Sequence, residues 1–519
     1  MDFAVLYPFR MFGNFLVLYG LSGILFRFIQ EGSYYLLRML YLRVSMDYFS
    51  VYFYYLLALI RCCVGVWSYY YIDRDESFSR FSLLVISFLL RMVVLIFVSN
   101  IYITLIGWDC LGITSFLLVI YYKNRKRLGS GIITGLTNRL GDCLLICFLG
   151  FLFNRDSHTG VLVLLVIIRI TKRAQYPFSS WLPAAIAAPT PVRALVHSST
   201  LVTAGVYVLI RYCFIDWFAL SIVGRITIII AGLRACAERD MKKVVALSTL
   251  SQLGLIIVSL GFVEKSYCFF HLTSHACFKA LLFICIGFCI HSVYGTQDYR
   301  RFNRLSATKS ISLLCAVASL SLMGFLFSSG FYSKDKILES LYNAEGSSWS
   351  LVLFLLGVGL TATYSIKILN SALLCGIFTG RNTRNLRGMR WQSKYPLHLL
   401  GAFSISYGST VDNFCRPFRI SFTTPEKFLP IWLMILGIIM GISFPRFNSS
   451  ALSRLLLLTP STQCIATLPL YLEQQKNVDK GWIEASSVRI SAMTSSLLYF
   501  YRPLVGVGLC SLLLFTIMI

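Results

Sequence analysis

The chain has 519 residues, of which 57% are hydrophobic and 13% are charged, and its mean hydropathy is +0.72. Because a soluble domain carries about 25% charged residues, this composition excludes a soluble enzyme and indicates an integral membrane protein. The formal net charge of +25 is spread through apolar sequence rather than gathered in a basic soluble patch, so we expect no nucleic-acid partner.

Residues 1–10 show no basic region before a short apolar run and no cleavage site, so we expect no removable signal. An apolar chain without a targeting segment fits synthesis inside the organelle that uses it. The sixteen cysteines have no metal-like spacing. Free cysteine packs as a small hydrophobic residue, so we expect neither a disulfide framework nor a bound metal.

A membrane span needs about 20 apolar residues, and the chain offers about fifteen candidates. The sequence places the first five at residues 3–28, 45–71, 81–98, 100–122 and 131–153, with a basic loop at 122–127. Beyond a second basic loop at 381–394, it predicts a short span at 397–407, a clearer one at 429–444 and a last one at 504–519.

Two of these spans carry an acidic residue well inside their ends. Asp109 lies inside the fourth span, and a carboxylate within a membrane is a functional candidate because burying it is costly. The alternative is a satisfied polar group at a helix cap. In the fifth span, Arg139 and Asp142 are three residues apart, so they share a helix face and can pair. The pair has either a structural or a direct proton role.

Residues 169–200 interrupt two apolar runs with Lys172, four prolines and His197. Proline removes a backbone donor, so no unbroken helix crosses here, and a broken helix is tolerated in a bilayer only inside protein or beside a wet cavity. We therefore expect an ion path at Lys172. The alternative is a loop whose lysine reaches the interface. Helical spacing places His197 on one face with Thr200 and Leu201, as a relay group or a structural one.

The span at 268–292 carries His271, His275 and Lys279. Residues at i, i+4 and i+8 form one stripe on a helix. Two histidines at this spacing suit a metal, but no Glu or Cys completes a site, so a stripe that carries protons between waters is the better interpretation. Upstream, Lys242 and Lys243 open another span, as interfacial anchors or as part of the same path.

A second broken span covers residues 310–341, where glycines flank a break beside Lys334 and Asp335. The spans fall into two sets of five, and the fourth member of each set is broken beside a lysine. Paired broken helices in corresponding positions indicate a transport path. The sets are residues 81–98, 101–122, 131–153, 161–178 and 184–212, and residues 218–235, 242–262, 268–292, 310–341 and 351–378.

The run TKRAQYPFSSWLPAAIAAPTPVRALVHSSTLVTAGVYVLIR at 171–211 resembles the signature of the antiporter-like subunits of respiratory complex I. Shorter motifs agree with it, namely GWD at 107–109, NRLGD at 138–142, DMKK at 240–243, STLSQLG at 248–254 and GFYSKD at 330–335. The similarity is greatest to the branch that holds subunit 5 of mitochondrial NADH:ubiquinone oxidoreductase. It is strong over residues 45–380 and weaker at both ends.

This resemblance implies an all-α polytopic membrane protein with about fifteen spans, two inverted five-helix repeats, two broken helices, and a C-terminal lateral helix followed by a last span. The expected divisions are N-terminal helices at 1–75, the two proton-channel repeats at 79–213 and 214–380, peripheral helices at 381–450, and the lateral helix with its anchor at 451–519. Pro460 and Pro469 would interrupt the lateral helix, leaving about 45 Å.

The resemblance also implies a function, which is proton translocation across the mitochondrial inner membrane, driven by electron transfer from NADH to ubiquinone in other subunits. This chain would hold no cofactor and no metal, while other subunits hold FMN, iron-sulfur clusters and the quinone site. Neighbouring antiporter-like subunits would be its partners. The implied proton path contains Asp109, Lys172, His197, Lys242, His271, His275, Lys279, Lys334 and Asp335, supported by Arg139 and Asp142. Asp109 stands where the family carries a longer glutamate.

Two other functions stay open. Multi-subunit cation/proton antiporters share these motifs and differ at the C-terminus, whereas a helical receptor or structural membrane protein would not need two lysine-centred breaks.

Several arginines fall inside apolar runs, where each would cost roughly 2.5–3.5 kcal/mol at a helix centre. Arg173 and Arg193 stand where relatives usually carry serine, and Arg234 stands where they carry a small residue. One hypothesis is that some of these are translation artefacts, because many invertebrate mitochondria read AGA and AGG as serine. The alternative is genuine arginines that reach water.

Overall fold

The computed structural model describes residues 44–72, 78–99, 101–122, 124–154, 181–212, 218–262, 265–292, 309–344, 348–373, 391–414 and 424–443, with a few positions in 171–179 and 295–298. All of them belong to one compact unit, Met1–Ser449. The predicted spans at 3–28 and 504–519, most of the span at 161–178 and the lateral helix after 451 lie outside the described residues.

The described residues form helices, with two isolated β-bridges between loops. Seven helical stretches within them are long and apolar enough to cross a membrane. The longer helices are α2 (Tyr48–Tyr71), α3 (Phe78–Phe97), α4 (Ile101–Ile120), α5 (Arg125–Asn154), α9 (Leu201–Tyr212), α10 (Phe218–Ala237), α11 (Met241–Phe262), α12 (Lys265–Ser292), α14 (Lys309–Met323), α15 (Ser329–Ala344), α16 (Ser348–Leu373), α17 (Trp391–Phe414) and α18 (Thr424–Ser443).

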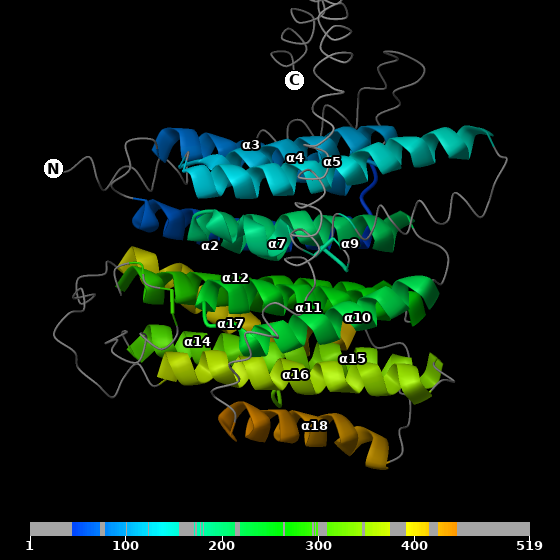
Figure 1. Ribbon diagram of the computed structural model, residues 1–519, viewed down its shortest axis with the longest axis vertical. Coiled ribbons are helices and arrows are strands. Elements are labelled where there is room, and N and C mark those ends of the chain that lie inside the picture. The colour runs from blue at the N-terminus through cyan, green and yellow to red at the C-terminus, as the bar shows by residue number, and fades with distance from the viewer. Residues whose placement is uncertain are drawn as a thin grey trace, which may run out of the picture. The chain divides into compact units, whose positions relative to one another are not determined.

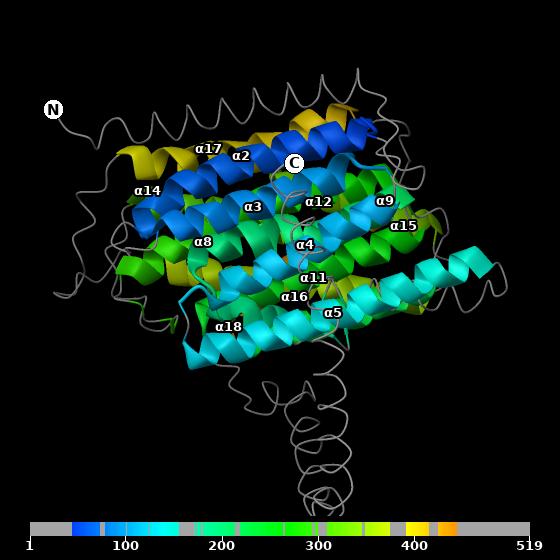
Figure 2. The same ribbon diagram turned by 90° about the horizontal axis from the view of Figure 1, so that it is seen from above.

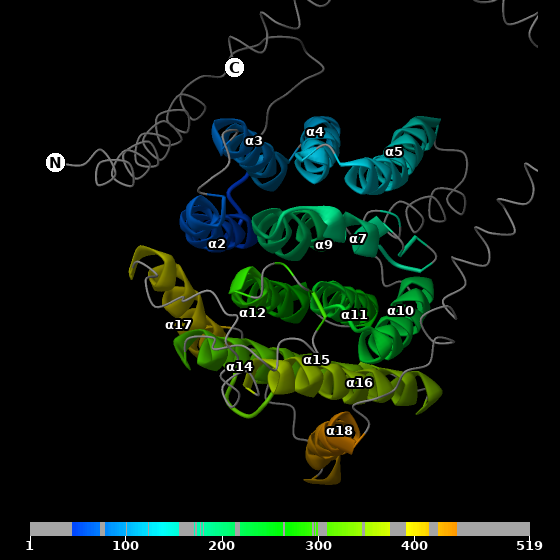
Figure 3. The ribbon, with the colours of Figure 1, turned by 60° about the vertical axis from the view of Figure 1, so that its left-hand side comes forward.

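The helices of this unit stack in rows (Figures 1 and 3). One row holds α3, α4 and α5, the next holds α2 and α9, and a third holds α12, α11 and α10, with α14, α15 and α16 packed beyond it. The helices α2 and α17 lie side by side (Figure 2). The outermost helix, α18, packs on α16.

The helix α12 has an apolar stretch that is entirely buried. A helix that is apolar all round belongs in the core, and side chains such as Phe270, Phe278 and Leu281 are fully enclosed there. Any polar group on α12 therefore needs partners on neighbouring helices, because an unpaired polar group away from water is costly.

Most predicted spans that fall on described residues match helices to within a few residues, and the loop at 122–127, the span at 397–407 and the segment after residue 180 differ. The basic loop expected at 122–127 is shorter, because α5 already begins at Arg125. The backbone N–H of Arg127 donates to the Asn124 carbonyl, and the Arg127 guanidinium lies 4.3 Å from the centre of the Tyr122 ring. The short span expected at 397–407 is only the middle of α17, whose polar ends the apolar pattern does not reveal.

The segment after the first predicted break is not a regular α-helix. A short α7 (Trp181–Ala184), a 3₁₀ turn (Ala185–Ala187) and a short α8 (Thr190–Val192) lead into a π-helix over Arg193–Thr200. Serine and threonine hydroxyls there bond carbonyls four and five residues back, as Thr200 does to Leu195 at 2.7 Å. Because a π-helix has a wider turn, residues three positions apart no longer share a face, so the placement of Thr200 beside position 197 is wrong, whereas Leu201 stays near that face.

Candidate proton path

The predicted stripe on α12 lies entirely inside the protein. His271, His275 and Lys279 have no exposed surface, and their spacing places them along one face of the helix. The ring centres of the two histidines are 6.4 Å apart. Among the described residues, no group of three metal-ligating side chains occurs.

Hydroxyl groups from two neighbouring helices meet this stripe. His271 Nδ1 lies 2.8 Å from Ser333 Oγ on α15, and Lys279 Nζ donates to Ser248 Oγ on α11 at 2.5 Å. Ser248 lies in the motif STLSQLG and Ser333 in the motif GFYSKD, but nothing in either motif singles out these serines.

The remaining ring nitrogens of the stripe are buried without partners. His271 Nε2 and both nitrogens of His275 form no hydrogen bond within the described structure. Leaving a buried polar group unsatisfied costs about 1–3 kcal/mol, so such groups need a reason to be there. Transfer of a proton through bound water would give imidazole nitrogens that reason.

The second predicted break is present between α14 and α15. The backbone turns at Gly324 (φ 83°) and Phe327 (φ 63°), and α15 starts at Ser329. Lys334 then reaches back and donates to the carbonyls of Leu322 and Met323, at 2.6 and 3.2 Å.

These carbonyls are the free acceptors at the end of α14, so a lysine at the break caps a helix C-terminus, where positive charge is favoured. Ser333, the residue before Lys334, contacts His271. The break and the α12 stripe therefore form one buried polar group of side chains. Asp335 is the next residue on α15, and its side chain is half-buried.

Asp109, Arg139 and Asp142 form a separate group on α4 and α5. Arg139 Nη1 lies 3.4 Å from Asp109 Oδ2 and 3.9 Å from Asp142 Oδ2, so the pairing of Arg139 with Asp142 is confirmed and Asp109 joins it. This group lies in the α3–α4–α5 row, whereas the stripe lies in the α12 row (Figure 3).

Two predicted residues of the first break cannot be placed. Lys172 and the side chain of His197 lie outside the described residues, so any contact between Asp109 and Lys172 stays a prediction. The chain on both sides of Lys172 is anchored, because Trp181 Nε1 donates to the Thr171 carbonyl at 3.0 Å and Thr227 Oγ1 donates to Gln175 Oε1.

The two lysines at the start of α11, Lys242 and Lys243, have different surroundings. Lys243 pairs with Asp240 at 3.0 Å near the surface, as an interfacial anchor would. Lys242 is half-buried.

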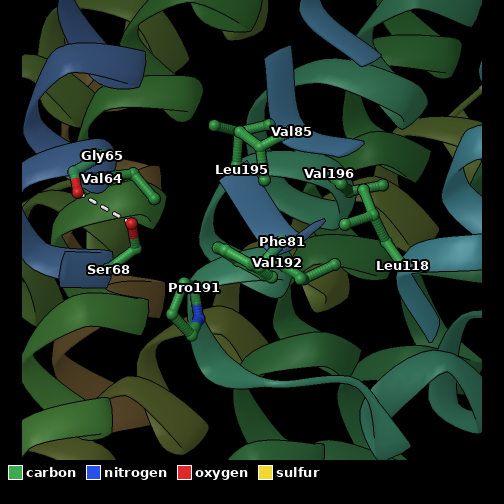
Figure 4. Close-up of a pocket in the computed structure, with 10 residues that line it drawn as sticks. All are labelled: Val64, Gly65, Ser68, Phe81, Val85, Leu118, Pro191, Val192, Leu195 and Val196. Atoms are coloured by element: carbon green, nitrogen blue, oxygen red, sulfur yellow. Dashed lines mark hydrogen bonds between the residues drawn. The ribbon is translucent and has the colours of Figure 1, made fainter. Parts of the chain in front are cut away.

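One small cavity lies beside the π-helix and has an apolar lining. Figure 4 shows it between α2, α3, α4 and the segment 191–196, with Val64, Phe81, Leu118 and Val192 in its wall. Its lining holds no charged or titratable side chain, so this cavity is not part of the polar path.

The sequence matches the family model described as NADH:quinone oxidoreductase/Mrp antiporter, TM, over residues 98–361. Curated relatives named NADH-ubiquinone oxidoreductase chain 5 include the Lumbricus terrestris protein, 38% identical over 82% of this chain and 80% of its own length. The Anopheles gambiae protein of that name is 37% identical over 84% of this chain and 82% of its own length. This chain belongs to the NADH-ubiquinone oxidoreductase chain 5 family.

Solved structures share the fold of this family member. A chain of the Mrp complex from Dietzia sp. DQ12-45-1b superposes with a TM-score of 0.71 at 21% identity, over 90% of this chain. This chain spans 56% of that longer one. A chain of the membrane-bound sulfane sulfur reductase, an archaeal respiratory membrane complex, superposes with a TM-score of 0.64 at 19% identity, over 78% of this chain and 85% of its own.

Proposed function

We propose that this chain is the proton-translocating, antiporter-like subunit in the membrane arm of NADH:ubiquinone oxidoreductase. The observation that carries the proposal is the buried row of Lys279, His275 and His271 on α12, whose two ends contact Ser248 and Ser333, the residue before Lys334. Titratable groups without exposure to water, with a hydroxyl at each end of their row, suit proton movement and serve little purpose in a purely structural span.

The chemistry is a change of protonation state at fixed positions. A lysine away from water holds its proton weakly, because desolvation disfavours the charged form. A nearby carboxylate favours the charged form, so movement of such a partner would let the proton leave. Asp109, Lys172, His197, Lys242 and Asp335 complete the proposed path.

The finer architecture is part of the same proposal. It consists of about fifteen spans with two inverted five-helix repeats and a lateral helix after residue 451. The rows in Figure 3 support the repeats, because α3, α4 and α5 run across the unit in one order and α10, α11 and α12 in the opposite order. The proposed location is the mitochondrial inner membrane, beside other antiporter-like subunits.

The proposal assigns no cofactor to this chain. NADH, FMN, iron-sulfur clusters and ubiquinone belong to other subunits, and the energy of electron transfer reaches this chain through coupled changes in polar groups.

A Lys279→Met variant tests the function in the assembled complex. We expect NADH-driven proton translocation to fall at least about tenfold, since one lost proton acceptor interrupts the stripe. The control is Lys243→Met, which removes a half-exposed lysine of the surface pair with Asp240. Undiminished translocation by the Lys279 variant would contradict the proposal.

The second candidate is a cation/proton antiporter subunit, which the fold of the Mrp chain favours. Isolation of the native complex distinguishes the two candidates. Migration with NADH oxidation supports complex I, whereas migration without it, together with sodium-dependent proton exchange, supports the antiporter.

A further inference from the structure

A second buried polar cluster lies between α11 and α16, beside the proposed path. The hydroxyl of Tyr364 on α16 lies 2.8 Å from Ser251 Oγ and accepts a hydrogen bond from Gln252 Nε2 at 3.3 Å. The side chains of Tyr364 and Gln252 are fully buried, and that of Ser251 is almost so. None of the three residues belongs to the α12 stripe.

Ser248 connects this cluster to Lys279. Its hydroxyl accepts a hydrogen bond from Lys279 Nζ at 2.5 Å, and its carbonyl accepts one from Ser251 Oγ at 3.0 Å. Ser248 and Ser251 are three residues apart and so lie on one face of α11. A single residue of α11 thus contacts both the stripe and the cluster.

The cluster can hold its hydrogen bonds in two opposite directions. In one arrangement Gln252 donates to Tyr364, Tyr364 to Ser251, and Ser251 to the Ser248 carbonyl. In the other, Ser251 donates to Tyr364, and Tyr364 donates to Gln252 Oε1 after the amide has turned over.

That amide oxygen is buried and accepts no hydrogen bond within the described structure, and the two ends of an amide are interchangeable in shape. A hydroxyl both donates and accepts, so the passage of one proton converts one arrangement into the other.

The α16 helix leads from the cluster toward water. Lys367, one turn beyond Tyr364, donates to the carbonyl of Cys236 at 2.9 Å and to that of Glu238, at the end of α10. The turn that follows carries the half-exposed pair of Asp240 and Lys243. Tyr364 is therefore one helical turn from the lysine that contacts the half-exposed turn between α10 and α11.

We propose that Ser251, Tyr364 and Gln252 form a proton relay, a side branch that leaves Lys279 across α11. The proposal rests on the proton-translocating function above. The Lys279 ammonium gives a proton to Ser248 Oγ. The Ser248 hydroxyl, which donates to the Val245 carbonyl at 2.7 Å, turns from that carbonyl and passes its own proton through a water molecule to Ser251.

Ser251 then passes its own proton to Tyr364, whose own proton turns from Gln252 Oε1 to a water molecule on the α16 side and leaves with it. Each hydroxyl gains one proton and loses one, so the balance is one proton lost by Lys279 and one gained by water. Gln252 holds the Tyr364 hydroxyl in either direction.

Tyr364→Phe in the assembled complex tests this relay, because it removes the hydroxyl and keeps the ring. Loss of one hydrogen-bonded relay group should slow NADH-driven proton translocation about two- to tenfold, with a changed ratio of rates in H₂O and D₂O. The matched control is Tyr207→Phe, since Tyr207 is equally buried and its hydroxyl donates to the Ile96 carbonyl at 3.2 Å. The control should translocate protons at the normal rate.

Ser251→Ala is the second variant, and it tests the relay by itself if the Tyr364 variant does not assemble. We expect it to slow translocation as Tyr364→Phe does, and the double variant to be no slower than either single one, because one branch is cut once. Normal translocation and an unchanged H₂O/D₂O rate ratio in both single variants would overturn the relay. It would also be overturned if the fold-reductions of the two single variants multiplied in the double variant. If Lys279→Met also translocates normally, the proposed function fails, whereas a defect in Lys279→Met alone removes only the relay.

Discussion

Lys334 shows how one residue can serve both the fold and the chemistry. Its ammonium caps the carbonyls of Leu322 and Met323 at the break, while its neighbour Ser333 contacts His271. A charge placed on free carbonyls is stabilised without a carboxylate, so the proton can be held there and released when the carbonyls move. Lys367 likewise donates to free carbonyls at the end of α10, those of Cys236 and Glu238.

Lys334→Met should impair both stability and translocation. It removes two hydrogen bonds from a charged donor, each worth about 1.5–3 kcal/mol, so we expect less assembled complex and proton translocation reduced at least about tenfold. Native gel electrophoresis measures the first effect and pumping per NADH oxidised the second. Lys336→Met, on the same helix, is the control, and equal behaviour of the two variants would contradict the role of Lys334.

The guanidinium of Arg211 has several hydrogen-bond acceptors, whereas that of Arg193 has few. Arg211 donates to the carbonyls of Ile96 and Val98 and pairs with Asp47 at 3.1 Å. Arg193 is 4% exposed and donates to the Ala188 carbonyl, while its Nε and Nη1 have no partner within the described structure. A buried guanidinium with unmet donors is unfavourable, which supports the hypothesis that serine occupies position 193.

Mass spectrometry of the native protein tests this hypothesis directly. We expect the peptide across position 193 to carry the mass of serine, and the peptide that contains Arg211 to carry the mass of arginine. An arginine mass at 193 would show that a charged group is genuinely buried beside the π-helix.

At the scale of elements, the break between α14 and α15 depends on close contact between backbones. A Cβ added to Gly330 would lie 1.8 Å from the Ser321 carbonyl oxygen, and Gly324 has a positive φ of 83°. Only glycine lets the start of α15 lie against the end of α14, and this contact sets the distance from Lys334 to its carbonyls.

Gly330→Ala should therefore open the break. Overpacking of this kind costs about 1–3 kcal/mol, and we expect a lower thermal stability of the complex together with lost proton translocation. Gly129→Ala is the control, since its added Cβ meets nothing within 4 Å and alanine favours a helix by about 1 kcal/mol. Equal stability of the two variants would contradict the packing argument.

At the scale of the whole molecule, burial is concentrated in the α12 row. The α12 and α11 spans are almost fully enclosed, whereas only a third of the α3 span is buried. Apolar side chains on α5 and α18, such as Leu136 and Trp432, are exposed, as lipid-facing or subunit-facing surfaces would be. The polar path thus runs through the part of the described structure that is best shielded from lipid.

Cysteine labelling tests this distribution. Cys143 on α5 is exposed, while Cys277 and Cys285 on α12 are buried. In the detergent-solubilised native protein, we expect a membrane-permeant maleimide to label Cys143 well before the other two, and all three after denaturation. Equal labelling before denaturation would mean that α12 is not enclosed, and the site would then be open to lipid or water.

The sequence by itself determined the class of protein, most helix positions and the α12 stripe. Apolar length alone marks a span, and the i, i+4, i+8 spacing fixes a common face whatever packs against it. The break between α14 and α15 was also predictable, because glycine acts on the local backbone, whereas the break beside Lys172 stays a prediction. The site roles and the domain boundaries stay predictions.

Only the tertiary structure decided which helices meet. The contacts of Ser248 and Ser333 with the stripe, the joining of Asp109 to Arg139, and the Tyr364 cluster all link residues 30 or more positions apart. No local pattern encodes such pairings, because they depend on how whole helices pack. The π-helix over Arg193–Thr200 has no sequence period of its own, so the wider turn at His197 appears only once the surrounding helices are in place.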